Sequence, residues 1–278
     1  MNPVTTPGGD SGTIHAKTMS DGESTIFLLH PRRRKKSRLP TCCRMFPVQT
    51  IAPLALTLTF NPMPTKDIQY LLFDHDGVLV DTEYWYFRAT QIALAELGVH
   101  MPLEHYRQHL VDGSPSFDLA RDAGCSAQEI NAARDKRNIY YQQFLAVEAI
   151  DIEGVPELLS ALKQHYRMAI VTTSKRVDFE FIHQHRDIVQ HMDFVLTRED
   201  YDQAKPDPEP YLTALSRFGA KRHQVLVIED SERGLRAAVA AKISCAVVAN
   251  SFTAHQELSA ADYRIASLNE LTALLDRH

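Results

Sequence analysis

Cysteine is scarce in this sequence, and the positions of the few cysteines exclude two classes of protein. The chain has 278 residues and four cysteines, at Cys42, Cys43, Cys125 and Cys245. Their spacing matches no zinc-binding pattern, and they are too few for a secreted domain that depends on disulfides. We therefore expect free thiols in a reducing compartment, and a cytoplasmic protein.

The sequence also lacks long apolar runs and, in its main part, an excess of positive charge. No segment approaches the ~20 apolar residues of a membrane-spanning helix, so we expect no membrane partner. Residues 67–278 hold 21 Lys or Arg against 32 Asp or Glu, which argues against nucleic acid as the main partner. No pattern predicts an oligomeric state.

The first 66 residues differ from the remainder in composition. They hold nine Lys or Arg against three Asp or Glu, and eight of the 14 prolines. No amphipathic period is present, so we expect residues 1–66 to be a disordered extension, with the working domain starting near Met63. The basic run Arg32–Arg38 and the apolar stretch Ile51–Phe60 leave two alternatives, a signal or transit peptide and a segment that binds an anionic surface.

From Ile68 onward, short apolar runs alternate with helical patterns. The runs predict strands at Tyr70–Phe73, Met168–Thr172, Phe194–Leu196, Val225–Ile228 and Cys245–Val248. The patterns between them predict helices near Pro156–His165, Val177–Arg186, Pro210–Phe218 and Arg233–Ala241. This alternation predicts an α/β fold with a doubly wound parallel sheet.

The alternation breaks once, between Glu83 and Ile150. No strand pattern occurs there, and helical patterns such as Ala89–Leu97 and Glu129–Phe144 take its place. The stretch is too long for a loop. We therefore expect a helical domain, residues 83–150, inserted into a core formed by residues 67–82 and 151–278.

Two carboxylates follow the first predicted strand, in the run Asp74-His75-Asp76-Gly77. Burying both is costly unless a cation or a proton lies between them. Gly77 lets the chain turn sharply. The arrangement is typical of a metal-dependent nucleophile with an acid beside it. His75 is expected to point to the opposite face and to pack there.

The run Asp74-x-Asp-Gly-Val-Leu-Val-Asp-Thr-Glu83 resembles the first motif of the haloacid dehalogenase (HAD) superfamily. It is most similar to the branch of phosphatases and phosphomutases that carry a small helical cap. The resemblance covers roughly residues 67–276 and implies a Rossmann-like core with the cap inserted after the nucleophile strand. It implies that Asp74 is the nucleophile, which forms an aspartyl-phosphate. Asp76 would be the general acid and base, and its backbone carbonyl would bind the metal.

Two further elements resemble motifs of this superfamily. The predicted strand that ends in Thr172-Thr173-Ser174 resembles the second motif, in which Thr172 binds the phosphoryl group and the backbone N–H of Thr173 assists. Lys205 opens the run Lys-Pro-Asp-Pro-Glu-Pro and matches the third motif. Prolines stiffen this segment, and a lysine held so rigidly can neutralise the phosphate and the nucleophile together.

The fourth element is the strand Val225–Ile228, which runs directly into Glu229 and Asp230. By resemblance this acidic pair completes the metal site begun by Asp74 and Asp76, with Asp230 as a direct ligand and Glu229 as a ligand through water. Oxygen ligands with retained water suit Mg²⁺. All four elements follow predicted strands, where open parallel sheets bind their ligands.

The preferred function is a Mg²⁺-dependent phosphatase that hydrolyses a small phosphorylated metabolite through an aspartyl-phosphate. The resemblance favours a sugar or polyol phosphate as the substrate. Candidate substrate contacts lie in the expected cap, at Asp112, Gly113, Ser114 and Ser116.

Two alternatives remain open. The first is a phosphomutase of the β-phosphoglucomutase type, although Tyr86 stands where such a mutase has a histidine, and Ser116 where its cap loop has an arginine. The second is of another class, a phospho-accepting signalling module or a catalytically inactive binding protein. Hydrolysis of a generic aryl phosphate would separate the two classes.

Overall fold

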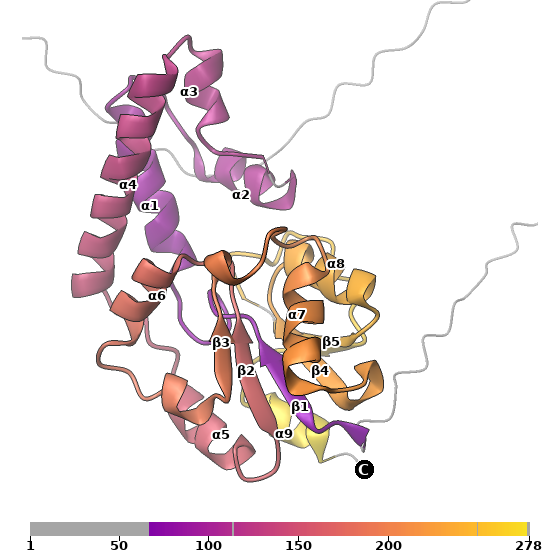
Figure 1. Ribbon diagram of the computed structural model, residues 1–278. Helices are drawn as coiled ribbons and strands as arrows, with labels where there is room; N and C mark the ends of the chain where they lie inside the picture. Colours follow the sequence, from indigo (N-terminus) through magenta and orange to yellow (C-terminus); the bar gives the residue numbers. More distant parts are fainter. Residues whose placement is uncertain (1–66, 113, 249, 277–278) are drawn as a thin grey trace, which may run out of the picture. The chain divides into compact units, whose positions relative to one another are not determined.

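The computed structural model describes residues 67–112, 114–248 and 250–276, except for the side chain of Asp112 (Figure 1). The predictions for residues 1–66 lie outside the described residues, as does candidate residue Gly113. Of the cysteines, Cys125 and Cys245 are described and both are free thiols.

Within the described residues, six strands form one parallel sheet in the order β3-β2-β1-β4-β5-β6. This confirms the predicted α/β fold. The sheet switches direction of winding at β1, which lies between β2 and β4 and aligns Phe73 with Ile170 and Ile228. The strands are β1 (Tyr70–Phe73), β2 (Arg167–Val171), β3 (Phe194–Leu196), β4 (Val225–Glu229), β5 (Ser244–Val248) and β6 (Tyr263–Ile265).

Alternate residues of the central strands enter two separate hydrophobic cores, one on each face of the sheet. In β1, Leu71 and Phe73 face one core, which α5 (Val155–Leu162), α6 (Arg176–His183) and α9 (Glu270–Leu275) complete. Leu72 faces the other, which α7 (Glu209–Phe218) and α8 (Glu232–Ala241) complete. Burial on both faces explains why these strands are continuous apolar runs rather than alternating ones.

Of the five helices between β1 and β2, the first four form a group of their own. They are α1 (Glu83–Ala95), α2 (Leu103–Asp112), α3 (Asp118–Asp122) and α4 (Ala127–Val147), and they share a third hydrophobic core around Leu94. The long helices α1 and α4 lie side by side (Figure 1). Ser126 begins α4 with a capping box, in which its hydroxyl accepts from the Glu129 N–H and the Glu129 carboxylate accepts from the Ser126 N–H.

Several elements differ from the sequence prediction. Helix α1 begins at Glu83 rather than near Ala89, and α2 and α3 lie in the stretch predicted to be helical without having been located individually. Helix α9 and strand β6 were not predicted; they have six and three residues, too few to show a period. Three 3₁₀ helices were also not predicted, at Val189–His191, Arg198–Asp200 and Arg222–Gln224. Among the described residues, no helix combines the length and the apolar character that crossing a membrane requires.

Candidate active site

Three carboxylates from two adjacent strands converge at the carboxyl edge of the sheet. Asp74 follows β1 directly, and its backbone N–H donates to the carbonyl of Ile228 on β4 at 2.8 Å. Glu229 ends β4 and Asp230 follows it. One ligand oxygen from each of these three side chains lies within 4.8 Å of the others. We call Asp74, Glu229 and Asp230 the carboxylate cluster.

The carboxylate cluster is short of positive charge. Burial raises the pKa of Asp74 to about 7, and repulsion from Glu229 adds to the effect. Burial, followed by Glu229 and Asp74, raises the pKa of Asp230 well above its usual range. Three acidic oxygens that repel one another in this way, two of them from buried residues, are the donor set that a hard divalent cation requires. The described residues thus fit a divalent metal.

Lys205 neutralises part of this charge. Its ammonium donates to Asp74 Oδ1 at 2.6 Å, to Glu229 Oε1 at 2.7 Å and to the carbonyl of Val171 at 2.9 Å. Burial disfavours the charged amine, but the two carboxylates outweigh it and raise the pKa of Lys205. Lys205 offsets one of the three negative charges of the cluster, and the two that remain match a divalent cation.

Glu229 is bound mainly by the protein itself. Its side chain is fully buried, and Oε1 accepts from Lys205 and from the hydroxyl of Tyr211 at 2.6 Å. Burial opposes its ionisation, but Lys205 and the Tyr211 hydrogen bond lower the pKa of Glu229. The sequence suggested a ligand through water. In the structure Glu229 is the counter-ion that holds Lys205 against Asp74.

Gly234 leaves the space that Glu229 occupies. A Cβ at Gly234 would overlap the Glu229 carboxylate. We expect Gly234→Ala to lower the free energy of unfolding by about 1–3 kcal/mol in a urea titration, although Gly to Ala normally stabilises an exposed helix by about 0.5–1 kcal/mol. The exposed Arg236→Ala change on the same helix is the control, with an expected effect below about 0.5 kcal/mol. A stabilised Gly234→Ala protein would contradict the prediction.

The carboxylate of Asp76 is held apart from the carboxylate cluster. Oδ2 accepts from the hydroxyl of Ser174 at 2.6 Å and of Thr172 at 3.4 Å, and Oδ1 accepts from the hydroxyl of Thr82. Burial opposes ionisation, but His75 and the hydroxyls outweigh it and lower the pKa of Asp76. A metal-binding role for Asp76 therefore stays a prediction that concerns its backbone carbonyl.

His75 packs on the opposite side from Asp74. Its ring is fully buried, 5.0 Å from the ring of Phe179, and its Nε2 lies 2.9 Å from Nε2 of His183 on α6. Burial, with the neighbouring His75 and Arg186, lowers the pKa of His183 to about 3. His75 Nδ1 also lies 3.2 Å from Asp76 Oδ2, although it is not aligned for a hydrogen bond. This proximity was not predicted.

The three hydroxyl residues that follow β2, Thr172, Thr173 and Ser174, differ in their burial and in their hydrogen-bond partners. Thr172 is fully buried, and its Oγ1 accepts from the N–H of Ser174 at 3.0 Å. Thr173 and Ser174 line the cavity above the cluster, and Thr173 Oγ1 accepts from Arg233 at 3.4 Å. The phosphate-binding roles of Thr172 and Thr173 stay predictions. Ser174, which binds Asp76, was missed, although it is the third hydroxyl of the Thr-Thr-Ser run.

A cavity of about 500 Å³ lies over the carboxylate cluster and is lined by the sheet edge and by helices α1, α2 and α4. Of the predicted substrate contacts, Ser114 and Ser116 line it, and Ser114 Oγ lies 2.6 Å from His109 Nδ1. Asp112 ends α2. Glu83 also lines the cavity, and burial, followed by repulsion from Asp76, raises its pKa to about 7.

Asn250 is a site residue that sequence reasoning missed. Its Nδ2 donates to Asp230 Oδ2 at 2.7 Å, while its Oδ1 accepts from the backbone N–H groups of Phe252 and Thr253. The loop thus holds the amide that orients Asp230. The feature of the sequence that could have identified Asn250 is its position as the first polar residue after β5.

Comparison with known proteins agrees with this geometry. Residues 71–248 match the family model described as haloacid dehalogenase-like hydrolase. The chain is 30% identical to the N-acetylmuramic acid 6-phosphate phosphatase of Pseudomonas aeruginosa, over 77% of this chain and 98% of that protein. It is 29% identical to protein CbbY of Cereibacter sphaeroides, over 74% and 95%. The crystal structure of CbbY from Rhodobacter sphaeroides in complex with phosphate superposes with a TM-score of 0.62 at 26% identity, over 73% of this chain and 96% of that one.

Proposed function

Because the chain belongs to the haloacid dehalogenase-like hydrolase family, we propose that it is a phosphatase that hydrolyses a small phosphate monoester through an aspartyl-phosphate on Asp74. The observation that carries this proposal is the placement of Asp74. Its carboxylate lines the cavity, is bound by Lys205 at 2.6 Å, and belongs to a carboxylate cluster that fits a divalent cation. These are the parts that phosphoryl transfer needs for positioning and charge neutralisation.

In the proposed reaction, an oxygen of Asp74 attacks phosphorus and the bond to the leaving oxygen breaks. Asp76 gives its proton to that leaving oxygen. It then takes a proton from the water that attacks the aspartyl-phosphate, which restores the Asp74 carboxylate and releases phosphate. Without substrate, His75 and the hydroxyl hydrogen bonds lower the pKa of Asp76 and keep it ionised. A phosphate monoester that enters the cavity raises this pKa by like-charge repulsion. Lys205 lies where it can stabilise charge on the phosphoryl oxygens.

Mg²⁺ is the proposed metal. Asp74 and Asp230 would hold it directly, together with the backbone carbonyl of Asp76, and Glu229 would act through water. The raised pKa values of Asp74 and Asp230 and the two unbalanced charges of the cluster support a divalent ion. When bound, such an ion lowers the cost of bringing an anionic phosphate to an anionic nucleophile.

Residues 83–150 are the proposed cap, on a core of residues 67–82 and 151–278. Helices α1 to α4 share a hydrophobic core of their own, and residues from three of them line the cavity above Asp74. A cap in this position would exclude water and contact the leaving group. The chemistry itself would stay with the core.

A phosphatase is favoured over a phosphomutase by Tyr86. This residue lines the cavity, and burial raises the pKa of its hydroxyl above the usual value. It therefore does not exchange a proton near neutral pH as a histidine would. The name of the Pseudomonas aeruginosa relative, a sugar phosphate phosphatase, makes a sugar or polyol phosphate the preferred substrate class for this chain.

The test is hydrolysis of p-nitrophenyl phosphate by the full chain with Mg²⁺. We expect turnover, and we expect Asp76→Asn to lower kcat roughly 10²-fold or more with little change in KM, because proton transfer is lost. The exposed Asp122→Asn change on α3 is the control. An unchanged kcat in Asp76→Asn would refute the role of Asp76. A stably phosphorylated protein without turnover would indicate the phospho-accepting signalling module instead.

A further inference from the structure

The arginines that line the cavity lack carboxylate partners. They are Arg134, Arg137, Arg198 and Arg233, and within the described part of the chain none forms an ion pair with Asp or Glu. Arg198 and Arg233 belong to the core, where Arg198 donates to the backbone carbonyls of Tyr201 and Asp202 and Arg233 donates to the hydroxyl of Thr173. Arg134 and Arg137 both lie on α4 in the proposed cap, and among the described residues their side-chain hydrogen bonds go only to neutral amides of the same helix, Asn131 at 3.4 Å and Asn138 at 2.9 Å.

Arg134 and Arg137 lie on one face of α4 because they are three residues apart. Their guanidinium carbons lie 5.5 and 5.9 Å from the centre of the same ring, that of Phe117. Arg137 also stacks over the ring of Tyr86 at 4.5 Å, and its Nε donates to Asn138 at 2.9 Å. The aromatic rings thus hold two half-buried positive charges close together at the wall of the cavity.

Nothing in this part of the cavity balances those charges fully. Of the acidic residues that line it away from the phosphate-handling groups, Glu83 has a pKa raised to about 7 by burial and by Asp76, so it is only partly ionised at neutral pH. Asp178 accepts a hydrogen bond from Gln142 instead. Two guanidinium groups that share one ring repel each other unless an anion lies between them. Their planar donors suit bidentate binding of phosphate or carboxylate.

We propose that the substrate carries a second anionic group, a phosphate or a carboxylate, which Arg134 and Arg137 bind while its ester phosphate meets Asp74. This inference rests on the proposed function and narrows its substrate class. A cavity of about 500 Å³ has room for a small molecule with an anion at each end. Ser116, next to Phe117, lines the same cavity and offers a further hydroxyl donor.

Three esters of equal length form the test: 4-hydroxybutyl phosphate, 4-phosphooxybutanoate and butane-1,4-diyl bisphosphate. We expect kcat/KM to be about 10- to 100-fold higher for at least one of the two doubly anionic esters than for the hydroxyl-ended one, mainly through KM. The comparison between the carboxylate and the phosphate arm identifies the second group. Arg134→Gln and Arg137→Gln should each reduce this ratio, and the double variant should bring it close to one.

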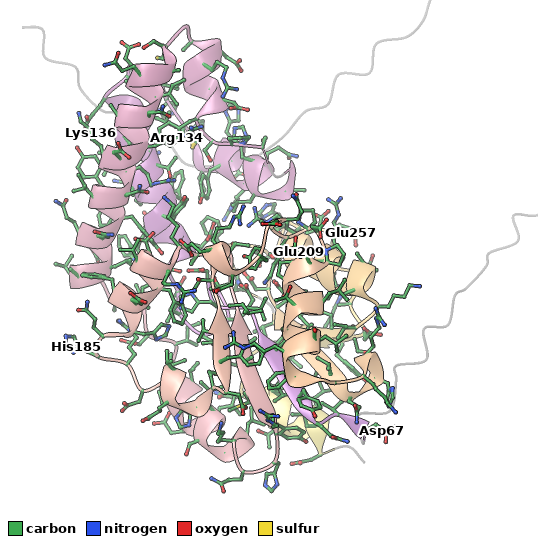
Figure 2. All side chains as sticks on the ribbon, in the orientation of Figure 1. Asp67, Arg134, Lys136, His185, Glu209 and Glu257 are labelled. Carbon is green, nitrogen blue, oxygen red and sulfur yellow. The ribbon has the colours of Figure 1, made fainter. Side chains whose placement is uncertain are left out.

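Lys136→Gln is the matched control, because it removes the same charge from the same helix. Lys136 pairs with Glu96 outside the cavity lining, and Figure 2 shows Lys136 and Arg134 on opposite sides of α4. In this variant, the ratio of kcat/KM between the doubly anionic and the hydroxyl-ended esters should equal that of the wild type, and so should the turnover. Equal kcat/KM for all three esters, or a preference that survives in the double variant, would overturn the inference while p-nitrophenyl phosphate is still hydrolysed. If no ester is hydrolysed, the aryl phosphate included, the proposed function fails and this inference fails with it.

Discussion

Asp74→Asn is expected to lower phosphatase turnover roughly 10⁴-fold or more, because the amide cannot form the aspartyl-phosphate. The substitution keeps the size of the side chain, and Lys205 retains Glu229 and the carbonyl of Val171 as acceptors. Binding of substrate should therefore survive while chemistry is lost. The measurement is single-turnover hydrolysis of p-nitrophenyl phosphate, with detection of phosphorylated protein after an acid quench.

The unfolding temperature of Asp74→Asn serves as a control for folding, because the direction of its expected change is known. The folded pKa of Asp74 is raised to about 7 by burial and by Glu229, above its ordinary value of 3.8. In metal-free protein, ionised Asp74 therefore costs stability, beginning as the pH rises past about 4 and complete above about 7. Metal-free Asp74→Asn should then unfold at no lower temperature than metal-free wild type at pH 8. Near-normal turnover in this well-folded variant would refute the covalent mechanism.

Removing divalent metal with excess chelator is expected to abolish hydrolysis, and excess Mg²⁺ should restore it. The physical reason is the unbalanced charge of the carboxylate cluster, where Asp74 and Asp230 repel Glu229 in a buried site. A second readout does not depend on activity. Mg²⁺ at 100 times its dissociation constant should stabilise the folded protein by about 2.7 kcal/mol, visible as a rise in melting temperature.

The Asp230→Asn variant distinguishes specific binding of Mg²⁺ at the carboxylate cluster from a general effect of salt on the melting temperature. This variant should lose most of the Mg²⁺-dependent rise in melting temperature, because it removes a charged oxygen from the cluster. The exposed Asp187→Asn change should keep the whole rise. Full activity in excess chelator, or an equal response of the two variants to Mg²⁺, would show that the cluster is not a metal site.

Much of the fold could be predicted from the sequence because its signals are local. Each central strand is a short run of apolar residues that must be buried on both faces, and each run ends in the first polar or charged residue. That pattern predicted the parallel sheet and placed Asp74, Glu229 and Asp230 at the same edge, whereas Lys205 was assigned by the resemblance of its proline-rich run to a family motif. Short elements such as β6 (Tyr263–Ile265) carry too few residues for a period, so they escaped prediction.

Only the tertiary structure decided which strands are neighbours and where each polar side chain points. The sequence predicted four acidic residues around a metal. In the fold, however, the Glu229 carboxylate binds Lys205 and Tyr211, and the Asp76 carboxylate accepts from Ser174 and Thr82. It also places Arg134 and Arg137 of α4 on a ring from a different segment, Phe117. The physical reason is that the hydrophobic period in a sequence describes one helix or strand and does not say which elements pack against it. The partner of a buried charge is chosen among donors and acceptors that distant elements bring together, where burial makes each unpaired group costly.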